Sequence, residues 1–320
     1  MPTAGQSIVV GLNAVILAAD PDQPQVLIVP QKDSDVALPF GPFNPAEDRT
    51  FEIGLRRWVA EQARFQLGYV EQLYTFGDRG REAPVAAMSG QENSRIISVG
   101  YLGLTPVAAP PPEGGGQWRD WYRFFPWEDW RNGKPDMIDS EIVPRLRAWA
   151  DEAGAPGGRA SRHDRLKHAF GLDDANWNEQ HALDRFELLY EAGLVDEAAR
   201  DGQTEGPPPG PKLGQPMASD HRRILATAIM RLRGKVRYRP IVFELMPEFF
   251  TLSALQQVVE GIVGYRLHKQ NFRRALDRTG FVEGTGRMEV KTGGRPAELF
   301  RYRRIALAGQ PSLGLATPRL

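Results

Sequence analysis

One stretch of the chain restricts its folding more than any other, the proline- and glycine-rich run Gly206-Pro207-Pro208-Pro209-Gly210-Pro211. Proline lacks a backbone N–H and fixes φ at about −65°, so neither a helix interior nor a central strand passes through such a run. We therefore predict a linker over residues 202–214, which separates the C-terminal part from the rest. A chain of 320 residues is also long enough for about two domains.

The composition excludes several classes of protein. Cysteine is absent, which rules out disulfide bonds and thiolate metal sites. The apolar stretch 8–19 is too short to cross a bilayer and has no basic residues before it, so we expect a cytoplasmic protein with no membrane partner. The five histidines are scattered, the nearest two being His163 and His168, and they suggest no metal site.

Charge is distributed unevenly along a chain whose net charge is zero. Residues 1–110 hold 8 Lys and Arg against 12 Asp and Glu, and residues 111–219 hold 13 against 20. Residues 220–304 hold 18 against 8, an excess of ten positive charges. A basic region of this kind indicates an anionic partner for the C-terminal part alone, or else a solvated basic face.

The first hundred residues or so alternate between strand and helix patterns. Apolar and β-branched residues predict strands at 6–19, 25–30, 73–76 and 95–104. Residues 50–66 place apolar side chains three and four apart, which predicts a helix with Thr50 as its N-cap and Gly68 after its end. This order of elements predicts the α+β class.

The middle of the chain, residues 105–219, is acidic. It begins with a proline- and glycine-rich loop at 105–116, followed by four of the seven tryptophans, Trp118, Trp121, Trp127 and Trp130. Helical patterns follow at 140–153, 159–170 and 178–200. We therefore predict a partly helical insert that packs on the first domain or on a dimer partner.

The basic C-terminal region has the order of elements of a winged helix-turn-helix. Amphipathic patterns, N-capped at Asp220 and Thr251, predict helices at 220–235, 251–263 and 267–279. A hairpin follows, with strands at 287–291 and 299–305 around a tip that contains Gly294 and Arg295. In this arrangement the helix at 267–279 enters the major groove of DNA.

The polar residues of this helix and of the wing suit contacts with DNA. Arginine bridges guanine, asparagine and glutamine bridge adenine, and arginine or lysine pairs with phosphates. We predict that a double-stranded DNA operator is bound by Lys269, Gln270, Asn271, Arg273, Arg274, Arg278, Lys291, Gly294 and Arg295. The alternative is a scaffold protein whose basic helices dock on an acidic protein surface.

Residues 41–64 resemble a Nudix box that has lost most of its metal ligands. Three motif positions are kept, Gly41, Glu47 and Arg57. One helical glutamate remains, Glu61, and the box is degenerate at Trp58, Gln62 and Arg64. A magnesium ion that bridges a diphosphate needs the lost carboxylates, so we predict no catalytic residues, no bound metal and no enzyme activity. The alternative is an active Nudix hydrolase of a nucleoside diphosphate derivative with an atypical box.

Several short runs carry a wider resemblance. In the first domain they are Glu71-Gln72-Leu73-Tyr74-Thr75-Phe76-Gly77-Asp78 and Arg95-Ile96-Ile97-Ser98-Val99-Gly100-Tyr101. In the C-terminal module they include Arg231-Leu232-Arg233-Gly234-Lys235, Tyr238-Arg239-Pro240, Phe250-Thr251-Leu252, Asn271-Phe272-Arg273-Arg274 and Gly294-Arg295-Pro296-Ala297. Both parts resemble the Nudix-related transcriptional regulators of NAD metabolism, a family in which a short connection replaces residues 105–219.

This resemblance implies a homodimeric repressor of NAD synthesis or salvage genes, without a cofactor, that senses ADP-ribose or a related NAD metabolite. The residues expected to contact the nucleotide effector are Arg57, Tyr74, Phe76, Asp78, Arg79, Arg81 and Arg95. Arginines would pair with the diphosphate and aromatic rings would stack on adenine, although Arg57 can also pair with Glu61 one turn away.

The resulting division of the chain has four parts. A Nudix-like α/β/α sandwich that senses the effector is expected at 1–104, and a partly helical insert that ends in the linker at 105–219. The DNA-binding winged helix is expected at 220–307 and a tail at 308–320.

Overall fold

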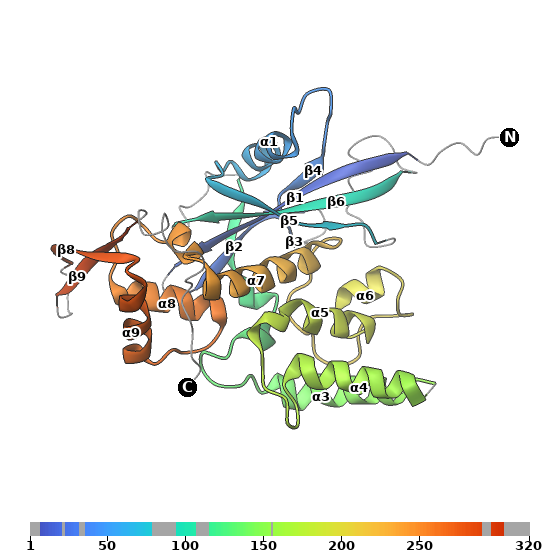
Figure 1. Cartoon of the computed structure of the whole chain (residues 1–320). Helices are drawn as coiled ribbons and strands as arrows, with labels where there is room; N and C mark the ends of the chain where they lie inside the picture. The colour runs from blue at the N-terminus through green and yellow to red at the C-terminus, as the bar shows by residue number, and fades with distance from the viewer. Residues whose placement is uncertain are drawn as a thin grey trace.

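A computed structural model describes residues 7–20, 23–31, 36–78, 94–106, 115–154, 156–289 and 296–303 (Figure 1). Its centre is a mixed β-sheet with helices on both faces, and a smaller module of two helices and a hairpin lies to one side. The predicted α+β class is confirmed.

The sheet is built from the first part of the chain and one strand of the middle part. Its strands are β1 (Ile8–Ala19), β2 (Pro24–Pro30), β3 (Val36–Ala37), β4 (Phe40–Pro42), β5 (Tyr69–Phe76), β6 (Arg95–Thr105) and β7 (Gln117–Asp120). The order is β3-β2-β1-β6-β5, while β4 pairs with β1 and β7 pairs with β2. β1 runs parallel to β6 and antiparallel to β2, so the two strands predicted at the start of the chain form a hairpin.

Helix α1 (Phe51–Ala63) covers one face of the sheet. The Thr50 hydroxyl accepts a hydrogen bond from the backbone N–H of Ile53 at 3.2 Å, so the predicted N-cap is confirmed. Arg64, with φ at 50°, ends the helix before Gly68, and the predicted end at that glycine was wrong. The apolar stripe of α1 packs Leu55 and Val59 into a buried cluster with the sheet, and that contact fixes the helix on this face.

Helix α7 (His221–Tyr238) covers the opposite face. Its apolar stripe includes Ile224, Ile229 and Leu232, all buried, as the periodicity predicts. Asp220 makes no side-chain capping bond to this helix, contrary to expectation, and its carboxylate lies 3.4 Å from Nη1 of Arg223 instead. The sheet with α1 and α7 forms an α/β/α arrangement as predicted, but its second helical layer comes from residues 221–238, which were expected to belong to the winged helix and not to the first domain.

The intervening segment, residues 115–219, belongs to the same packed body as the sheet. β7 pairs with β2, and Trp121 and Trp127 are fully buried in one cluster with α7. Its helices are α3 (Val143–Asp151), α4 (Pro156–Phe170), α5 (Ala182–Glu191) and α6 (Asp196–Arg200). The expectation that this segment packs on the first domain is confirmed, and the sheet reaches into the part of the chain predicted to be an insert.

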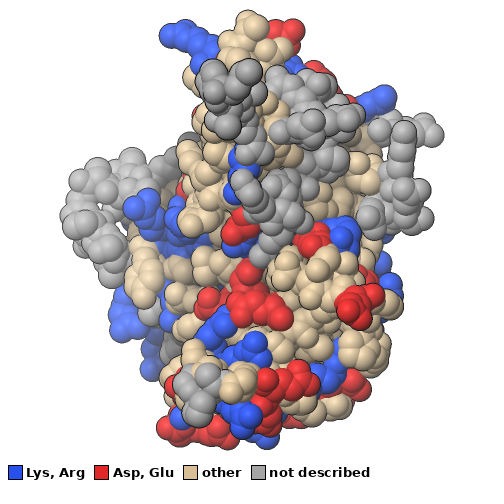
Figure 2. All heavy atoms as spheres, turned by 90° about the vertical axis from the view of Figure 1, so that its right-hand side faces the viewer, with Lys and Arg blue, Asp and Glu red and all other residues tan. Residues whose placement is uncertain are grey.

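Acidic and basic residues are mixed on the outside of this segment. Figure 2 shows the side of the molecule away from the C-terminal module, with the helices of the intervening segment in the lower half. Asp and Glu gather there among Lys and Arg, so the described residues visible on this side form no continuous basic surface.

The proline- and glycine-rich stretch 202–214 lies against neighbouring helices. Arg145 of α3 donates a hydrogen bond to the carbonyl of Pro209, and Arg222 of α7 donates one to the carbonyl of Leu213. The Leu213 side chain is buried in the main core. The stretch therefore connects α6 to α7 along the protein surface and is anchored at its second half.

The C-terminal module contains α8 (Leu252–Val263), α9 (Lys269–Thr279), β8 (Val282–Glu289) and β9 (Ala297–Tyr302). The Thr251 hydroxyl caps α8, as predicted, and Gly264 and Gly280 end the two helices with φ of 84° and 63°. β8 begins five residues earlier than predicted, because a register shift between Gly284 and Met288 lets the glycine-containing stretch stay in the strand. Across the part of the chain that the structure describes, every helix is too short or too polar to span a bilayer.

Candidate functional site

The degenerate box lies where β4 meets α1. The indole Nε1 of Trp58 donates to the carbonyl of Pro42 at 2.9 Å, and its ring lies directly on Gly41. A Cβ at Gly41 would overlap this ring, so only glycine fits beneath it. The tryptophan therefore occupies the space beside the loop.

Gln62 closes the same region from the next turn of α1. Its side-chain oxygen accepts from the N–H of Phe40 at 2.9 Å, and its side-chain nitrogen donates to the carbonyl of Phe40 at 2.7 Å. This pair of bonds continues the hydrogen-bonding pattern of a strand. A glutamate here would have no donor for the carbonyl of Phe40, so glutamine suits a structural role.

Arg57 has a partner that its sequence spacing did not reveal. Its guanidinium binds both carboxylate oxygens of Asp48, at 2.9 and 3.2 Å, and Asp48 is only 3% exposed. Hydrogen bonding to Arg57 holds the pKa of Asp48 below its ordinary value. The predicted contact with Glu61 also exists, at 3.6 Å, but the Asp48 pair is the shorter one. Arg57 thus fixes the loop before α1.

Four other candidate effector residues meet at the end of β5. Tyr74 is 56% exposed and its ring contacts Phe76, which is buried. Arg95, at the start of β6, donates to the carbonyl of Gly77, next to Asp78. Arg57 is separated from this group, because it lies on α1 and Phe76 faces α7 across the sheet. Arg79 and Arg81 lie outside the described residues.

Cationic side chains of helix α7, spaced eight and four residues apart, bond to residues along β5 and just after its end. Arg223 pairs with Asp78 at 2.5 Å and lies over the ring of Phe76 at 5.4 Å. About two and three turns further along α7, Arg231 bonds the carbonyl of Leu73, and Lys235 pairs with Glu71. The strand that carries the candidate effector residues is thus in direct contact with the helix that leads to the C-terminal module.

Helix α9 presents its polar residues to solvent. Phe272 and Leu276 are buried, as predicted, and the opposite side is exposed. The exposed set is Lys269, Gln270, Asn271, Arg273, Arg274 and Arg278. Six polar side chains, four of them cationic, thus lie on the exposed side of α9, and their positive charge is of the sign that attracts an anionic polymer.

The turn between α8 and α9 is held by Glu260, a buried residue that sequence reasoning missed. One carboxylate oxygen accepts from the N–H of Leu267 at 2.9 Å, and the other from Arg266 at 2.9 Å. A glutamate on an apolar helix, four residues before the glycine that ends it, is a signal that could have been used. It fixes the angle between the two helices.

The hairpin β8–β9 packs beside these helices. The ring of Phe243 stacks on Tyr302 at 4.3 Å, and Phe281 meets both rings edge-on. Backbone bonds of 2.8 and 3.0 Å join Phe250 to Phe300. The strands are thus firmly attached to the module, while Lys291, Gly294 and Arg295 at the predicted wing tip lie outside the described residues.

A mixed sheet between two helical layers, joined to a helix pair and hairpin, defines a Nudix-like domain with a C-terminal winged helix. Residues 242–302 match the family described as the NrtR DNA-binding winged helix domain. An 86-residue stretch, 27% of this chain, is 42% identical to a protein of Acinetobacter baylyi named ADPR responsive transcriptional repressor NtrR. The match spans about a third, 34%, of that relative's length.

Solved structures show the same fold over nearly the whole chain. NrtR of Shewanella oneidensis matches over 97% of this chain and 99% of its own, with a TM-score of 0.54 and 18% identity. The same protein in complex with a 27mer DNA matches equally far, with a TM-score of 0.52 and 19% identity. A MutT/nudix family protein of Enterococcus faecalis covers 95% of this chain and 89% of its own, with a TM-score of 0.51 and 16% identity. The C-terminal module thus matches the NrtR winged helix domain over residues 242–302, and the predicted fold, a Nudix-like domain followed by a winged helix, is confirmed.

Proposed function

We propose that this protein is a DNA-binding transcriptional repressor that responds to ADP-ribose or a related NAD metabolite. The observation that carries the proposal is α9, an exposed cationic helix in a domain that matches the NrtR winged helix. A relative that is 42% identical over 86 residues is named an ADPR responsive transcriptional repressor, and this name supports both the DNA-binding and the effector-binding part of the proposal. The target genes would be those of NAD synthesis or salvage.

DNA recognition would be divided between α9 and the wing. Asn271 and Arg274 would read base edges in the major groove, and Lys269 and Arg273 would pair with phosphates on either side. The wing residue Arg295 would reach the backbone or the minor groove. A homodimer would present two such helices to a palindromic operator, because two-fold protein symmetry matches two-fold DNA symmetry.

The effector would bind at the end of β5 without being hydrolysed. Tyr74 offers an exposed ring for stacking, Arg95 offers a guanidinium for the diphosphate, and Asp78 offers hydrogen-bond acceptors for a ribose. Phe76 would support the stacking ring, and Arg79 and Arg81 remain predicted contributors. Arg57 was also predicted, but its pairing with Asp48 on the other face of the sheet keeps it away from this end of β5. The Arg223–Asp78 pair supports coupling to DNA binding, because it joins this strand to α7.

An active Nudix hydrolase is the second candidate function, and the residues of the degenerate box argue against it. Trp58 and Gln62 make hydrogen bonds to the β4 region where a working box presents carboxylates to magnesium. Glu47 and Glu61 remain, and Glu61 is half exposed beside Arg57. We therefore propose a domain that binds its nucleotide and leaves it intact, in the cytoplasm, where the bacterial chromosome lies.

Selection from a random double-stranded DNA library by the full-length protein tests the DNA half. We expect a palindromic consensus with half-sites about 34 Å apart or a multiple of that distance. Operator affinity is then titrated with ADP-ribose, NAD and nicotinamide mononucleotide, and calorimetry on the full chain measures binding of each. The DNA half fails if no consensus emerges, and the effector half fails if none of the three nucleotides binds.

A further inference from the structure

The turn that leads into α9 rests directly on the intervening segment. The backbone N–H of Trp130 donates to the carbonyl of Gly264 at 2.6 Å. Gly264 has φ of 84°, and a Cβ there would overlap the carbonyl of Glu128. The close approach of two backbones and the left-handed conformation both require glycine at this position.

The last carbonyl groups of α8 are bonded by side chains from outside the module. These groups have no partner within the helix, and burial without a partner would be costly. The Tyr122 hydroxyl donates to the carbonyl of Gly261 at 2.8 Å, and Nε of Arg233 donates to the carbonyl of Ile262 at 2.9 Å. The cation on Arg233 also complements the negative end of the helix dipole.

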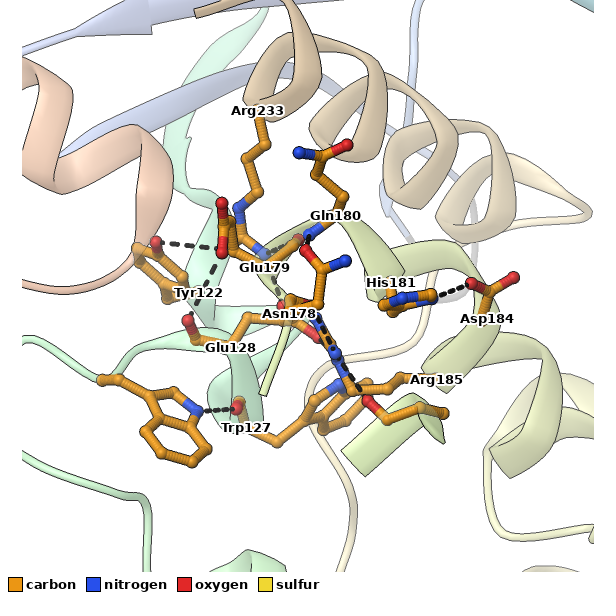
Figure 3. Close-up of polar contacts among 12 residues, drawn as sticks. Tyr122, Trp127, Glu128, Asn178, Glu179, Gln180, His181, Asp184, Arg185 and Arg233 are labelled. Atoms are coloured by element: carbon orange, nitrogen blue, oxygen red, sulfur yellow. Dashed lines mark hydrogen bonds and ion pairs between the residues drawn. The ribbon is translucent and has the colours of Figure 1, made fainter. Parts of the chain in front are cut away.

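A buried carboxylate holds this arginine in place (Figure 3). Glu128 binds Arg233 through Oε2 at 2.5 Å and Arg185 through both oxygens at 2.5 and 2.8 Å. All three side chains are at most 1% exposed. Burial alone raises the pKa of Glu128, but the two guanidinium groups outweigh it and keep the pKa below its ordinary value. Removal of one partner would leave an uncompensated buried charge, which is costly. The three side chains are therefore held together, and they keep Arg233 in one position.

Two separate sets of contacts therefore determine the position of α9. Glu260 sets the internal geometry of the turn, because it belongs to α8 and bonds Leu267. Tyr122, Glu128 and Arg233 set where the end of α8 lies relative to the sheet. They belong to the intervening segment and to α7, so residues outside the module contribute to its placement, beside the apolar side chains that α8 buries in the main core.

We infer that Glu128, Arg233 and Tyr122 are positioning residues for DNA recognition, which act by fixing the end of α8 and the following turn on the body of the protein. The inference rests on the proposed DNA-binding function. A recognition helix held in one place loses less freedom on binding, and two such helices in a dimer keep a constant spacing. The intervening segment would thus contribute to operator affinity without touching DNA.

Matched variants in the full-length protein test this. Tyr122→Phe removes one hydroxyl that bonds α8, and Tyr190→Phe is its control, because the Tyr190 hydroxyl bonds Asp201 within the same segment. Glu128→Gln removes the buried charge beside Arg233, and Glu197→Gln is its control, because Glu197 pairs with the buried Arg222 but does not reach α8. Both controls delete the same chemical group at a similar depth.

Two measurements decide the outcome. We expect Tyr122→Phe to raise the operator Kd by about threefold or more and Glu128→Gln by about tenfold or more, while each control stays within about twofold. Hydrogen exchange should speed up at residues 261–267 in the two test variants only, with the sheet amides unchanged. If Glu128→Gln does not fold, Tyr122→Phe and its control carry the test alone.

The inference is overturned if Tyr122→Phe and Tyr190→Phe match each other in both operator affinity and exchange. A wild-type protein that selects no DNA sequence would refute the proposed function instead. In that case the exchange measurement still decides whether these residues fix the turn.

Discussion

The indole of Trp58 lies on the backbone of Gly41, and its Nε1 donates to the neighbouring carbonyl of Pro42. A large apolar side chain and a residue with no side chain thus fit together at the position of a metal-binding loop. Because the two residues are seventeen positions apart, the fit ties the loop before α1 to the second turn of that helix.

This fit makes Gly41 intolerant of substitution. Gly41→Ala should lower the free energy of unfolding by about 1 to 3 kcal/mol, because the new methyl group overlaps the ring. Gly77→Ala is the control, since a Cβ at Gly77 meets no atom within 4 Å. Urea denaturation measures both. In the double variant with Trp58→Ala, the cost of Gly41→Ala should largely disappear, and additive effects would contradict the explanation.

Catalytic silence is the second prediction. With magnesium or manganese, the protein should leave ADP-ribose and NADH intact, because Trp58 and Gln62 stand where the box needs carboxylates. Product formation is followed by chromatography over hours, with an active Nudix hydrolase as the positive control. Turnover above about 1 per second would restore the hydrolase interpretation.

The third prediction separates base reading from phosphate pairing. Arg274→Ala should cost about 1 to 3 kcal/mol of operator binding, and the loss should depend on operator sequence, since arginine reads guanine edges. Arg295→Ala should weaken all sequences alike and reduce the log–log salt slope by about 0.9. Arg165→Ala, an exposed pair with Glu191 on α4 and α5, is the control. Mobility-shift titrations at two salt concentrations distinguish these, and wild-type affinity in both variants would move the DNA surface elsewhere.

The fourth prediction concerns pH. His221 is fully buried, and burial lowers its pKa to about 3 from an ordinary 6.5. Between these values the unfolded chain holds a proton that the folded chain lacks, so stability falls as the pH falls. From pH 7 to pH 5 this residue alone should cost about 2 kcal/mol. Asp48 and Glu128 also have lowered pKa values, but their ordinary values of 3.8 and 4.5 place their effect at lower pH.

The matching variant is His221→Asn, whose side-chain oxygen can take over the hydrogen bond from the N–H of Leu38, at 3.1 Å in the wild type. Denaturation curves at pH 7 and pH 5 should differ by about 2 kcal/mol less in this variant than in the wild type. Equal pH dependence in the two proteins would show that another group titrates.

Local features of the fold were predictable from sequence, because they depend on neighbouring residues. Thr50 and Thr251 cap their helices, and Phe272 and Leu276 turn inward, all within a few residues of their partners. The strand β7 was missed since four residues carry too little pattern to separate a strand from a loop.

The buried charges could not be predicted in the same way. Glu128 meets Arg185 and Arg233 across 57 and 105 positions, and a charged residue is expected at the surface until its partners are known. In the candidate effector region, sequence grouped Arg57 with residues that lie across the sheet. The spacing of residues along the sequence does not predict which face of the sheet a helix will cover.

The pairing of β7 with β2 determines where this protein can be truncated for expression. Gln25 to Ile28 on β2 are bonded to β7 and would otherwise form an open sheet edge. A fragment that stops after β6 would leave those backbone groups free to recruit another chain, and such edges promote aggregation. Expression of the sheet domain alone should therefore continue past residue 120, and natural shuffling of this gene would have to carry the strand along with the sheet it completes.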